Sequence, residues 1–364
     1  MDESVIFYVS GHGFGHSART ATVIDRLLRE RPGIRVIVKT SAPEWFFREQ
    51  IRGDFDFFAL ECDTGVVQAD SLNLDPAASL EGYTGFLERL EETAAAEAGF
   101  AGRENCRLIV GDIPPLAFEV AARAGVPSLA VANFSWDWIY EPYIERLPEY
   151  GFLLPAIREG YRKASLLLRL PFAGEMDAFP AVRDIPLIAR RARVAAGEVR
   201  KRLGLENNRP LVILSFGGFS LGEEYYRQLI EIKDCLWLAS ERVGFDLPGL
   251  RNVGRKELGR LRLGYPDLVA AAEVVITKPG YGIISECIAN RTRMLYTSRG
   301  EFREYPVLVE GIKRNLPSGF VSQEKLLSGD IRDELSRLLE APPDFTPLPV
   351  DGAEAVAEII SGYL

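Results

Sequence analysis

The sequence predicts an α/β protein of two domains, each built on a parallel sheet. Two observations carry this prediction. The pattern of a short apolar run, a glycine turn and a helix occurs twice, once at 5–19 and once at 274–286. The chain also has 364 residues, which is more than one hydrophobic core usually serves. Nucleotide-binding sheets are assembled from strands that lead through glycines into helices, so we expect two such sheets.

The first half of the chain alternates apolar runs with helical stripes, as stacked strand–helix–strand units do. Apolar residues within 21–28 and within 80–94 recur at helical spacing. Because helices separate the strands, we expect parallel pairing through right-handed crossovers. The predicted strands are 5–10, 34–40, 55–60, 107–110 and 128–132.

The second half repeats this pattern after a stretch, 180–204, that is rich in charge and poor in strand-forming residues. We expect the junction between the domains there. The predicted boundaries are 1–185 for the first domain, 186–204 for the linker and 205–364 for the second domain. The predicted strands of the second domain are 211–215, 236–239, 273–277 and 293–296.

The composition excludes several classes of protein. Hydrophobic residues make up 47% of the chain and charged residues 26%, as in a globular enzyme. The net charge of −9 argues against a nucleic-acid partner, because phosphate backbones are bound by basic surfaces. The start of the chain lacks the basic residues of a signal peptide, and charges such as Glu273 interrupt the long apolar runs. We therefore expect a cytoplasmic protein without a transmembrane helix.

The cysteines and one basic stretch allow further expectations. Four cysteines without CxxC spacing predict reduced, packed thiols and no metal site. Six arginine and lysine residues crowd 190–202. This stretch predicts a solvated linker and helix face or, alternatively, a patch for an anionic acceptor or for peripheral membrane contact.

The first glycine turn predicts a ligand site with a histidine base. Gly13 and Gly15 lack Cβ atoms, which lets a ligand approach the backbone closely. The turn is not a dinucleotide fingerprint, because His16 stands where the last glycine would be. At a helix N-terminus the imidazole is expected to be neutral and able to accept a proton, so His16 is our candidate general base. The alternative for His16 is a capping or structural role, and for His12 the structural role is the one we expect.

Asp112 is the candidate partner of this base. It follows the apolar run 108–110 and therefore lies at the carboxyl edge of a strand, as His16 does. A carboxylate there could fix the tautomer of the imidazole and stabilise its charged form. The alternative is that Asp112 caps a helix that starts near Pro114.

Two loops of the second half predict anion sites. Gly217 and Gly218 follow a strand, and the loop 279–282 precedes a helix expected at 283–289, with Lys278 beside it. Backbone N–H groups and a helix N-terminus can both hold a phosphate. Glu286, expected in the first turn of that helix, could accept hydrogen bonds from ribose hydroxyls or could simply complement the helix dipole.

Acceptor contacts are predicted from two segments. Trp136 lies in an aromatic cluster that could stack on a sugar ring, and Asp137 beside it could bind hydroxyls. The alternative is that these residues pack a loop. The stretch 62–79 is long for a structureless connection, which favours a functional loop near the ligand, with Gln68 and Asp70 as its polar candidates.

Five segments also carry a family resemblance: Ser-Gly-His-Gly-Phe-Gly-His at 10–16, Thr-Ser-Ala-Pro at 40–43, Gly-Val-Val-Gln-Ala-Asp-Ser-Leu at 65–72, Asn-Phe-Ser-Trp-Asp-Trp-Ile-Tyr at 133–140 and Lys-Pro-Gly-Tyr-Gly-Ile-Ile-Ser-Glu at 278–286. They resemble the glycosyltransferase-like amino-terminal region of plant L-arabinokinases. More broadly, the two glycine turns are similar to those of GT-B glycosyltransferases, including the N-acetylglucosaminyltransferase of peptidoglycan lipid intermediates and the UDP-glycosyltransferases.

The resemblance implies two Rossmann-like domains facing a cleft, the GT-B fold, with the donor nucleotide on the second domain and the acceptor on the first. His16 matches the histidine near the reaction centre of such enzymes, and Asp112 matches the aspartate that pairs with it. The donor residues expected from the turns and the resemblance are Gly13, Gly15, Gly217, Gly218, Phe219, Lys278, Gly280, Tyr281, Gly282, Glu286 and Glu304. The expected acceptor residues are Gln68, Asp70, Trp136 and Asp137.

The sequence departs from these families in two places. The ATP loop of the kinase half of L-arabinokinases does not occur here, so we expect no phosphotransfer from the resemblance. The Asp-Gln pair that ends the plant UDP-glycosyltransferase signature is replaced by Glu-Phe-Arg-Glu-Tyr-Pro at 301–306. Within it, Glu304 could still accept hydrogen bonds from sugar hydroxyls, with a plain surface charge as the alternative.

Together these features predict an inverting glycosyltransferase that needs no metal or cofactor. Its expected donor is a nucleotide-sugar, first of all a UDP-sugar, and its expected acceptor is a hydroxyl of a glycan or a lipid-linked molecule. Two alternatives remain open. A nucleotide-sugar 2-epimerase would also ionise the anomeric carbon, and a non-catalytic nucleotide-sugar binding or sensing protein would keep Gly280, Gly282 and Glu286 without using His16.

Overall fold

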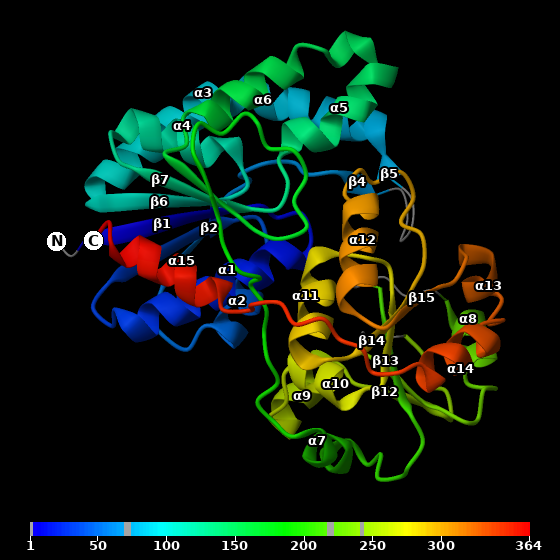
Figure 1. Cartoon of the computed structure of the whole chain (residues 1–364). Coiled ribbons are helices and arrows are strands. Elements are labelled where there is room, and N and C mark those ends of the chain that lie inside the picture. Colours follow the sequence, from blue (N-terminus) through cyan, green and yellow to red (C-terminus); the bar gives the residue numbers. More distant parts are fainter. Residues whose placement is uncertain (1–2, 69–73, 217–221, 241–243) are drawn as a thin grey trace.

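The computed structural model describes residues 3–68, 74–216, 222–240 and 244–364 (Figure 1). Four of the predicted site residues lie outside this part of the chain: Asp70, Gly217, Gly218 and Phe219.

The first domain is built on a seven-stranded sheet in the order β3-β2-β1-β6-β7-β8-β9, and its strands all pair in parallel. Its strands are β1 (Ser4–Val9), β2 (Arg35–Thr40), β3 (Asp56–Ala59), β6 (Cys106–Asp112), β7 (Ser128–Ala132), β8 (Leu166–Arg169) and β9 (Val182–Asp184). The five predicted strands are confirmed. β8 and β9 were not predicted, and β9 falls in the expected junction, where an exposed edge strand of charged residues has no apolar pattern.

Helices cover both faces of this sheet (Figure 1). One face packs against α1 (Phe14–Glu30) and α2 (Glu44–Gln50), and the other against α3 (Pro76–Arg103), α4 (Pro115–Ala124), α5 (Trp136–Arg146) and α6 (Leu153–Arg162). The strand residues alternate between the two resulting cores. Both predicted helical stripes are buried in them, at 21–28 in α1 and at 80–94 in α3. A short hairpin, β4 (Val67–Gln68) with β5 (Leu74–Asp75), precedes α3.

The second domain is built on a six-stranded parallel sheet in the order β12-β11-β10-β13-β14-β15. Its strands are β10 (Leu211–Ser215), β11 (Leu236–Ala239), β12 (Leu250–Asn252), β13 (Val274–Thr277), β14 (Arg293–Tyr296) and β15 (Ser318–Phe320). The four predicted strands are confirmed, and the two short edge strands are additional. Its helices are α7 (Ala196–Leu203), α8 (Glu223–Leu229), α9 (Arg255–Leu261), α10 (Tyr265–Ala271), α11 (Tyr281–Asn290), α12 (Tyr305–Asn315), α13 (Gln323–Leu327) and α14 (Arg332–Glu340).

Both sheets reverse their strand order once, at β1 and β6 in the first domain and at β10 and β13 in the second. In open α/β sheets, ligands bind beyond the carboxyl ends of the strands at this switch point. The first glycine turn follows β1, and Asp112 is the last residue of β6. The second glycine turn, 278–282, follows β13 and leads into α11. The topology therefore places the predicted site segments at the two switch points.

The last helix, α15 (Gly352–Ser361), returns to the first domain and packs on α1 (Figure 1). Arg31 Nη2 of the first domain donates to the Ser361 carbonyl at 2.8 Å, and the Gly352 N–H donates to the Leu187 carbonyl at 3.1 Å. The predicted division assigned all of 205–364 to the second domain, whereas α15 packs on the first. As a result, two chain segments cross between the domains.

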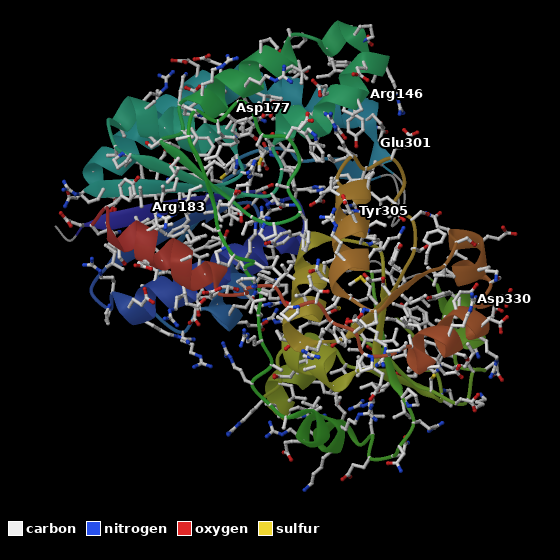
Figure 2. The ribbon with its side chains drawn as sticks, in the orientation of Figure 1. Arg146, Asp177, Arg183, Glu301, Tyr305 and Asp330 are labelled. Atoms are coloured by element: carbon white, nitrogen blue, oxygen red, sulfur yellow. The ribbon has the colours of Figure 1, made fainter. Side chains whose placement is uncertain are left out.

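Ion pairs also join the domains at their surfaces. Arg146 of α5 pairs with Glu301, which precedes α12, and the two lie side by side in Figure 2. Arg303 Nη1 donates to the Trp138 carbonyl at 2.6 Å. On the other side, Arg255 of α9 pairs with Glu49 of α2. The domains are thus in direct contact around the switch points.

Candidate active site

The predicted pair of His16 and Asp112 is formed. Gly13 ends the turn after β1 with a φ of +72°, a backbone conformation that favours glycine, and α1 starts at the next residue. His16 is therefore in the first turn of α1, and it is 6% exposed. Its Nδ1 lies 2.8 Å from Oδ1 of Asp112, the last residue of β6. The alternative that Asp112 caps a helix is wrong, because α4 starts at Pro115 with Pro114 as its cap.

Arg19, a residue that the sequence analysis missed, binds the same carboxylate. Its Nε donates to Asp112 Oδ2 at 2.7 Å, and Thr20 Oγ1 donates to the same oxygen at 2.8 Å. Burial opposes the ionisation of Asp112, but Arg19 and His16 outweigh it and lower its pKa to about 2. Arg19 is one helical turn after His16, so the spacing could have indicated that both side chains share a face.

The ionised carboxylate fixes the tautomer of His16. Arg19 Nη2 lies 3.1 Å from His16 Nδ1, which would fit a lone pair on that nitrogen. A lone pair there would, however, face Asp112 Oδ1 at 2.8 Å, and a carboxylate can only accept. We therefore infer that Nδ1–H donates to Asp112, which leaves the lone pair on Nε2. That is the state a general base needs.

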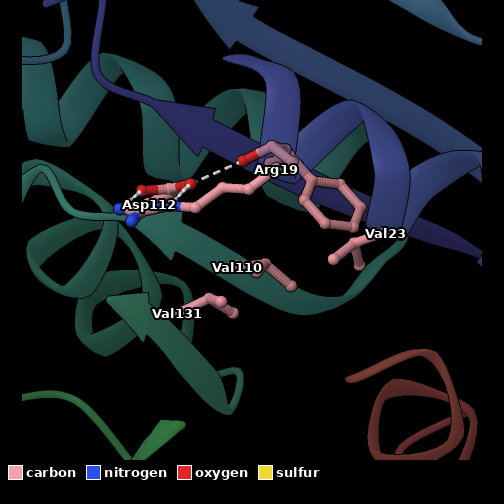
Figure 3. Close-up of a pocket in the computed structure, with 7 residues that line it drawn as sticks. Arg19, Val23, Val110, Asp112 and Val131 are labelled. Carbon is pink, nitrogen blue, oxygen red and sulfur yellow. Dashed lines mark hydrogen bonds and ion pairs between the residues drawn. The ribbon is translucent and has the colours of Figure 1, made fainter. Parts of the chain in front are cut away.

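The space behind Asp112 is too small for a substrate. Figure 3 shows the Arg19 side chain reaching Asp112 above Val110 and Val131, with Val23 beside it. The cavity among these residues has a volume of about 10 Å³. A cavity of that size holds one water molecule at most.

A chain of buried polar groups leads from Asp112 into the second domain. Arg19 Nη1 donates to Asn133 Oδ1 at 2.7 Å, and Asn133 Nδ2 donates to Glu304 Oε1 at 2.6 Å. Glu304 is 3% exposed, so the alternative of a plain surface charge is wrong. These hydrogen bonds join His16 and Glu304, the predicted donor-sugar residue, in one network across the domains.

The second glycine turn faces the first one. Gly280 caps α11, which starts at Tyr281 and thus two residues earlier than predicted. A Cβ on Gly282 would lie 3.8 Å from the Cα of Gly15 in α1. The Arg19 guanidinium also lies over the Tyr281 ring, 5.4 Å from its centroid. The structure therefore brings the N-termini of α1 and α11 together.

Arg299 adds a positive charge at the N-terminus of α11, and the sequence analysis missed it. A Cβ on Gly280 would lie 3.8 Å from Arg299 Nη1, which donates to the Pro279 carbonyl at 3.1 Å. The side chain is 15% exposed and pairs with Glu304 at 3.6 Å. Burial, partly offset by Glu304, lowers the pKa of Arg299. With Lys278 half-buried beside the turn, this end of α11 is suited to an anion.

A cavity of about 350 Å³ opens beside the first glycine turn. The hairpin residue Gln68, predicted to contact the acceptor, lines it. His12 lines it as well, and His12 Nδ1 accepts a hydrogen bond from the Val66 N–H at 3.4 Å. Burial lowers the pKa of His12 to about 3, so this imidazole is neutral and accepts the hydrogen bond from the residue that precedes the hairpin. The lining residues are Gly11, His12, Gly13, Ser41, Glu61, Asp63, Thr64, Val66 and Gln68.

Solved structures share this architecture over the whole chain. The crystal structure of the calicheamicin glycosyltransferase CalG4 covers 100% of this chain and 99% of its own, with a TM-score of 0.66 and 15% identity. Phytolacca americana UGT2, complexed with UDP-2-fluoro-glucose and pterostilbene, covers 100% and 94%, with a TM-score of 0.58 and 14% identity. The chain has the GT-B fold.

Two curated proteins are similar in sequence. L-arabinokinase of Arabidopsis thaliana is 30% identical over 358 residues, which are 97% of this chain and 34% of that protein. The chain thus spans about a third of the length of this relative. An uncharacterized glycosyltransferase of Methanopyrus kandleri is 23% identical over 289 residues, 72% of this chain and 77% of that protein. No protein-family model matches the chain.

Glu286 of the GT-B second domain lies deeper than predicted. It is in the second turn of α11, not in the first, so it does not complement the helix dipole. It pairs with Arg190, whose Nη1 donates to Gln50 Oε1 of α2 at 2.7 Å. Burial raises the pKa of Glu286, with Arg190 opposing, and its Oε2 has no hydrogen-bond partner among the described residues. Its contact with ribose stays a prediction.

Trp136 and Asp137 are buried in the first GT-B domain, in helix α5 and not in a loop. Trp136 is 0% exposed and its ring stacks on Tyr140 at 5.7 Å, so no face is open to a sugar ring. Its Nε1 instead donates to Asp63 at 2.8 Å. Asp137 pairs with Arg158 of α6 at 2.9 Å. The alternative, packing, is what the structure shows for both residues.

Residues of the basic stretch 190–202 form ion pairs within the GT-B fold, and the cysteines pack in its interior. Arg200 pairs with Glu273, and Arg202 pairs with Glu198 at 2.8 Å, which favours the linker interpretation over a surface patch. All four cysteines are buried and free, as predicted. Within the described residues, no cluster of histidine, cysteine and acidic side chains could hold a metal ion, and no helix is long and apolar enough to cross a membrane.

Proposed function

We propose that the chain is an inverting glycosyltransferase that moves a sugar from a nucleoside diphosphate donor to an acceptor hydroxyl. The observation that carries the proposal is the meeting of the two switch points. The His16–Asp112 pair lies at one of them, and the N-terminus of α11 with Lys278 and Arg299 lies at the other. A base and an anion site on opposite domains are the two groups that sugar transfer requires.

In this reaction the acceptor oxygen attacks the anomeric carbon from the side of the first domain. His16 Nε2 takes the hydroxyl proton as the new C–O bond forms, and Asp112 stabilises the resulting imidazolium. The bond between the anomeric carbon and the phosphate oxygen breaks, and its electron pair leaves with the diphosphate. Because the nucleophile displaces the diphosphate directly, the configuration at the anomeric carbon inverts.

The second domain stabilises the leaving diphosphate. The free N–H groups at the start of α11 carry the positive end of the helix dipole, and Arg299 and Lys278 add full charges. Such preorganised groups contribute about 10²–10³-fold to the rate when they meet charge that develops in the transition state. The UDP-2-fluoro-glucose in the UGT2 structure supports a UDP-sugar as the first donor to try.

Donor hydrolysis tests the proposal without knowledge of the acceptor. We would screen UDP-, GDP- and dTDP-sugars by thermal shift and then follow the release of free sugar by mass spectrometry. We expect one nucleotide class to stabilise the protein and its sugar to be released slowly, with water as the acceptor. Stabilisation without release would favour a sensing protein, and a changed configuration at C2 of the released sugar, seen by NMR, would favour the 2-epimerase. A protein that binds none of these nucleotides would contradict the proposal.

A further inference from the structure

The 350 Å³ cavity has the position of an acceptor site. It lies at the carboxyl edge of the first sheet, where the turns after β1, β2 and β3 meet, and it shares Gly13 with the turn that leads to His16. Its volume is at the lower end of the ~300–1,000 Å³ range of small-molecule sites. A molecule the size of one sugar ring therefore suits it better than an extended chain.

The lining is rich in hydrogen-bond acceptors. Asp63 and Glu61 contribute carboxylates, and Glu61 Oε2 also accepts from Arg89 Nη2 at 3.1 Å. Gln68 Oε1 is buried without a hydrogen-bond partner among the described residues. Ser41 and Thr64 add hydroxyls. Among the described lining residues no lysine or arginine is present, and Val66 is the one aliphatic side chain. Such a surface matches a ligand that donates many hydrogen bonds and repels an anion.

Asp63 is held in a fixed orientation toward this cavity. Ser10 Oγ donates to its Oδ1 at 2.8 Å, and Trp136 Nε1 donates to its Oδ2 at 2.8 Å. Each carboxylate oxygen has a second lone pair, so both can still accept a hydroxyl. The predicted acceptor residue Trp136 thus acts behind Asp63, as the group that positions it.

We propose that this cavity binds the acceptor and selects a small, hydroxyl-rich molecule without negative charge, such as a neutral sugar or polyol. The inference rests on the proposed glycosyl transfer and names its acceptor class. Glu61, Asp63 and Gln68 accept hydrogen bonds from the acceptor hydroxyls, which leaves one hydroxyl for His16. An aryl acceptor would leave the buried Gln68 oxygen without a hydrogen bond, and an acidic acceptor would face the carboxylate of Asp63.

The test uses the full chain with the donor found by the hydrolysis assay. The neutral probes are glucose and myo-inositol, the acidic probes are glucuronate and glucose 6-phosphate, and the aryl probe is pterostilbene. Transfer is measured as product mass, and probe binding by saturation-transfer NMR in the presence of the nucleotide. We expect the neutral probes to be bound and used at least about tenfold better than the others, a difference of ~1.4 kcal/mol.

Glu61→Gln is the decisive variant, because Glu61 is exposed and its ion pair with Arg89 lies at the surface, so the substitution should not disturb folding. We expect it to raise KM for the neutral probes about tenfold, because an amide oxygen accepts a weaker hydrogen bond than a carboxylate does. It should also reduce the difference in binding and transfer between the neutral and the acidic probes. Asp63→Asn should do the same where it folds, whereas Glu324→Gln, on α13 and far from the cavity, should change neither value.

Three results would overturn the inference: preference for an acidic or aryl probe, no effect of Glu61→Gln on a neutral acceptor, or donor hydrolysis with neither transfer to nor binding of the neutral probes. In all three the donor is still bound and hydrolysed, so the proposed function survives. Failure of the function itself is a different result, because the wild-type chain would then either bind no nucleotide-sugar or bind one without releasing its sugar.

Discussion

Gly15 of α1 and Gly282 of α11 face each other across the domain interface, and a Cβ on Gly282 would lie 3.8 Å from the Cα of Gly15. Each glycine belongs to the first turn of its helix, so the positive ends of two helix dipoles converge at one place. No side chain separates the two backbones at this point. A diphosphate bound there would be approached by N–H groups from both domains.

This closeness predicts a graded effect of substitution at Gly282. Gly282→Ala adds an atom at ordinary contact distance and should leave UDP affinity within about threefold, less than 1 kcal/mol. Gly282→Val adds two methyl groups that must push α11 away from α1, so it should weaken UDP binding at least about tenfold. Calorimetry on the two folded variants measures this. A Val variant that binds UDP like the wild type would remove this turn from the donor site.

Arg299 should matter for the diphosphate and not for the nucleoside. We expect Arg299→Ala to weaken UDP binding about 10–100-fold, because a charged hydrogen bond is worth ~1.5–3 kcal/mol, and to leave uridine binding unchanged. Arg314→Ala is the matched control, since Arg314 is exposed on α12 and pairs with Glu310. If uridine and UDP lost affinity equally, Arg299 would have a structural role only.

Removal of the Asp112 charge should destabilise the first domain strongly. Asp112→Asn leaves Arg19 buried without its counter-ion, and a broken buried ion pair costs about 3–5 kcal/mol. Thr20→Val removes one hydrogen bond that a hydroxyl donates to the same carboxylate, which should cost about 1.5–3 kcal/mol and leaves the ion pair intact. Chemical denaturation compares the two variants. Equal stability would show that the Arg19–Asp112 pair contributes little.

Asp112 and His16 should also act as one catalytic unit. Asp112→Asn should slow transfer by allowing the wrong tautomer of the imidazole, and adding it to His16→Ala should make the rate little worse than His16→Ala alone. Independent, multiplying losses in the double variant would show that Asp112 acts on the reaction by another route.

Because of Asp63, the stability of the protein should decrease as the pH rises from about 4 to about 6. Burial raises the pKa of Asp63 to about 6, despite hydrogen bonds from Trp136 and Ser10 that lower it. An unfolded aspartate titrates near ~3.9, so between these values the folded state holds a proton that the unfolded state has lost. The stabilisation is complete below about pH 4 and is lost as the pH rises through 6, by up to ~3 kcal/mol at ~1.4 kcal/mol per pKa unit.

The Asp63→Asn variant isolates this effect, because its side chain does not titrate. Measured by urea denaturation across this range, the stability of the wild type relative to the variant should fall with rising pH. Asp330→Asn, an exposed substitution on the second domain, should run parallel to the wild type. A constant difference between wild type and Asp63→Asn would mean that the pKa of Asp63 in the folded state is not raised above its value in the unfolded state.

Local sequence patterns predicted the central strands because these are buried on both faces. β1, β6, β10 and β13 are short apolar runs for that reason. The edge strands β9, β12 and β15 have three residues each and carry polar side chains, so they leave no such pattern. The His16–Asp112 pair could be predicted because both residues follow central strands at one switch point.

Other features depend on contacts that no local pattern contains. α15 packs on α1 through residues more than 300 positions apart, as in the pair of Arg26 and Glu354. Asp63 is positioned by Trp136, 73 residues later in the chain, so its role emerged only from the packing of α5. The local sequence around Trp136 predicts a platform for a sugar ring for the same reason, because it does not show that Trp136 is buried in the folded protein.

The most direct test of the account is the transfer rate of His16→Ala. As the general base His16 should contribute about 10²–10⁴-fold, so the variant should lose at least ~10²-fold in kcat, while the Kd for the nucleotide-sugar stays close to that of the wild type. The rate is to be measured across the pH range in which a histidine titrates, with Arg314→Ala, an exposed substitution on α12, as the control. A His16→Ala variant that keeps more than about half of the wild-type rate would contradict base catalysis by His16, whose loss should cost at least ~10²-fold.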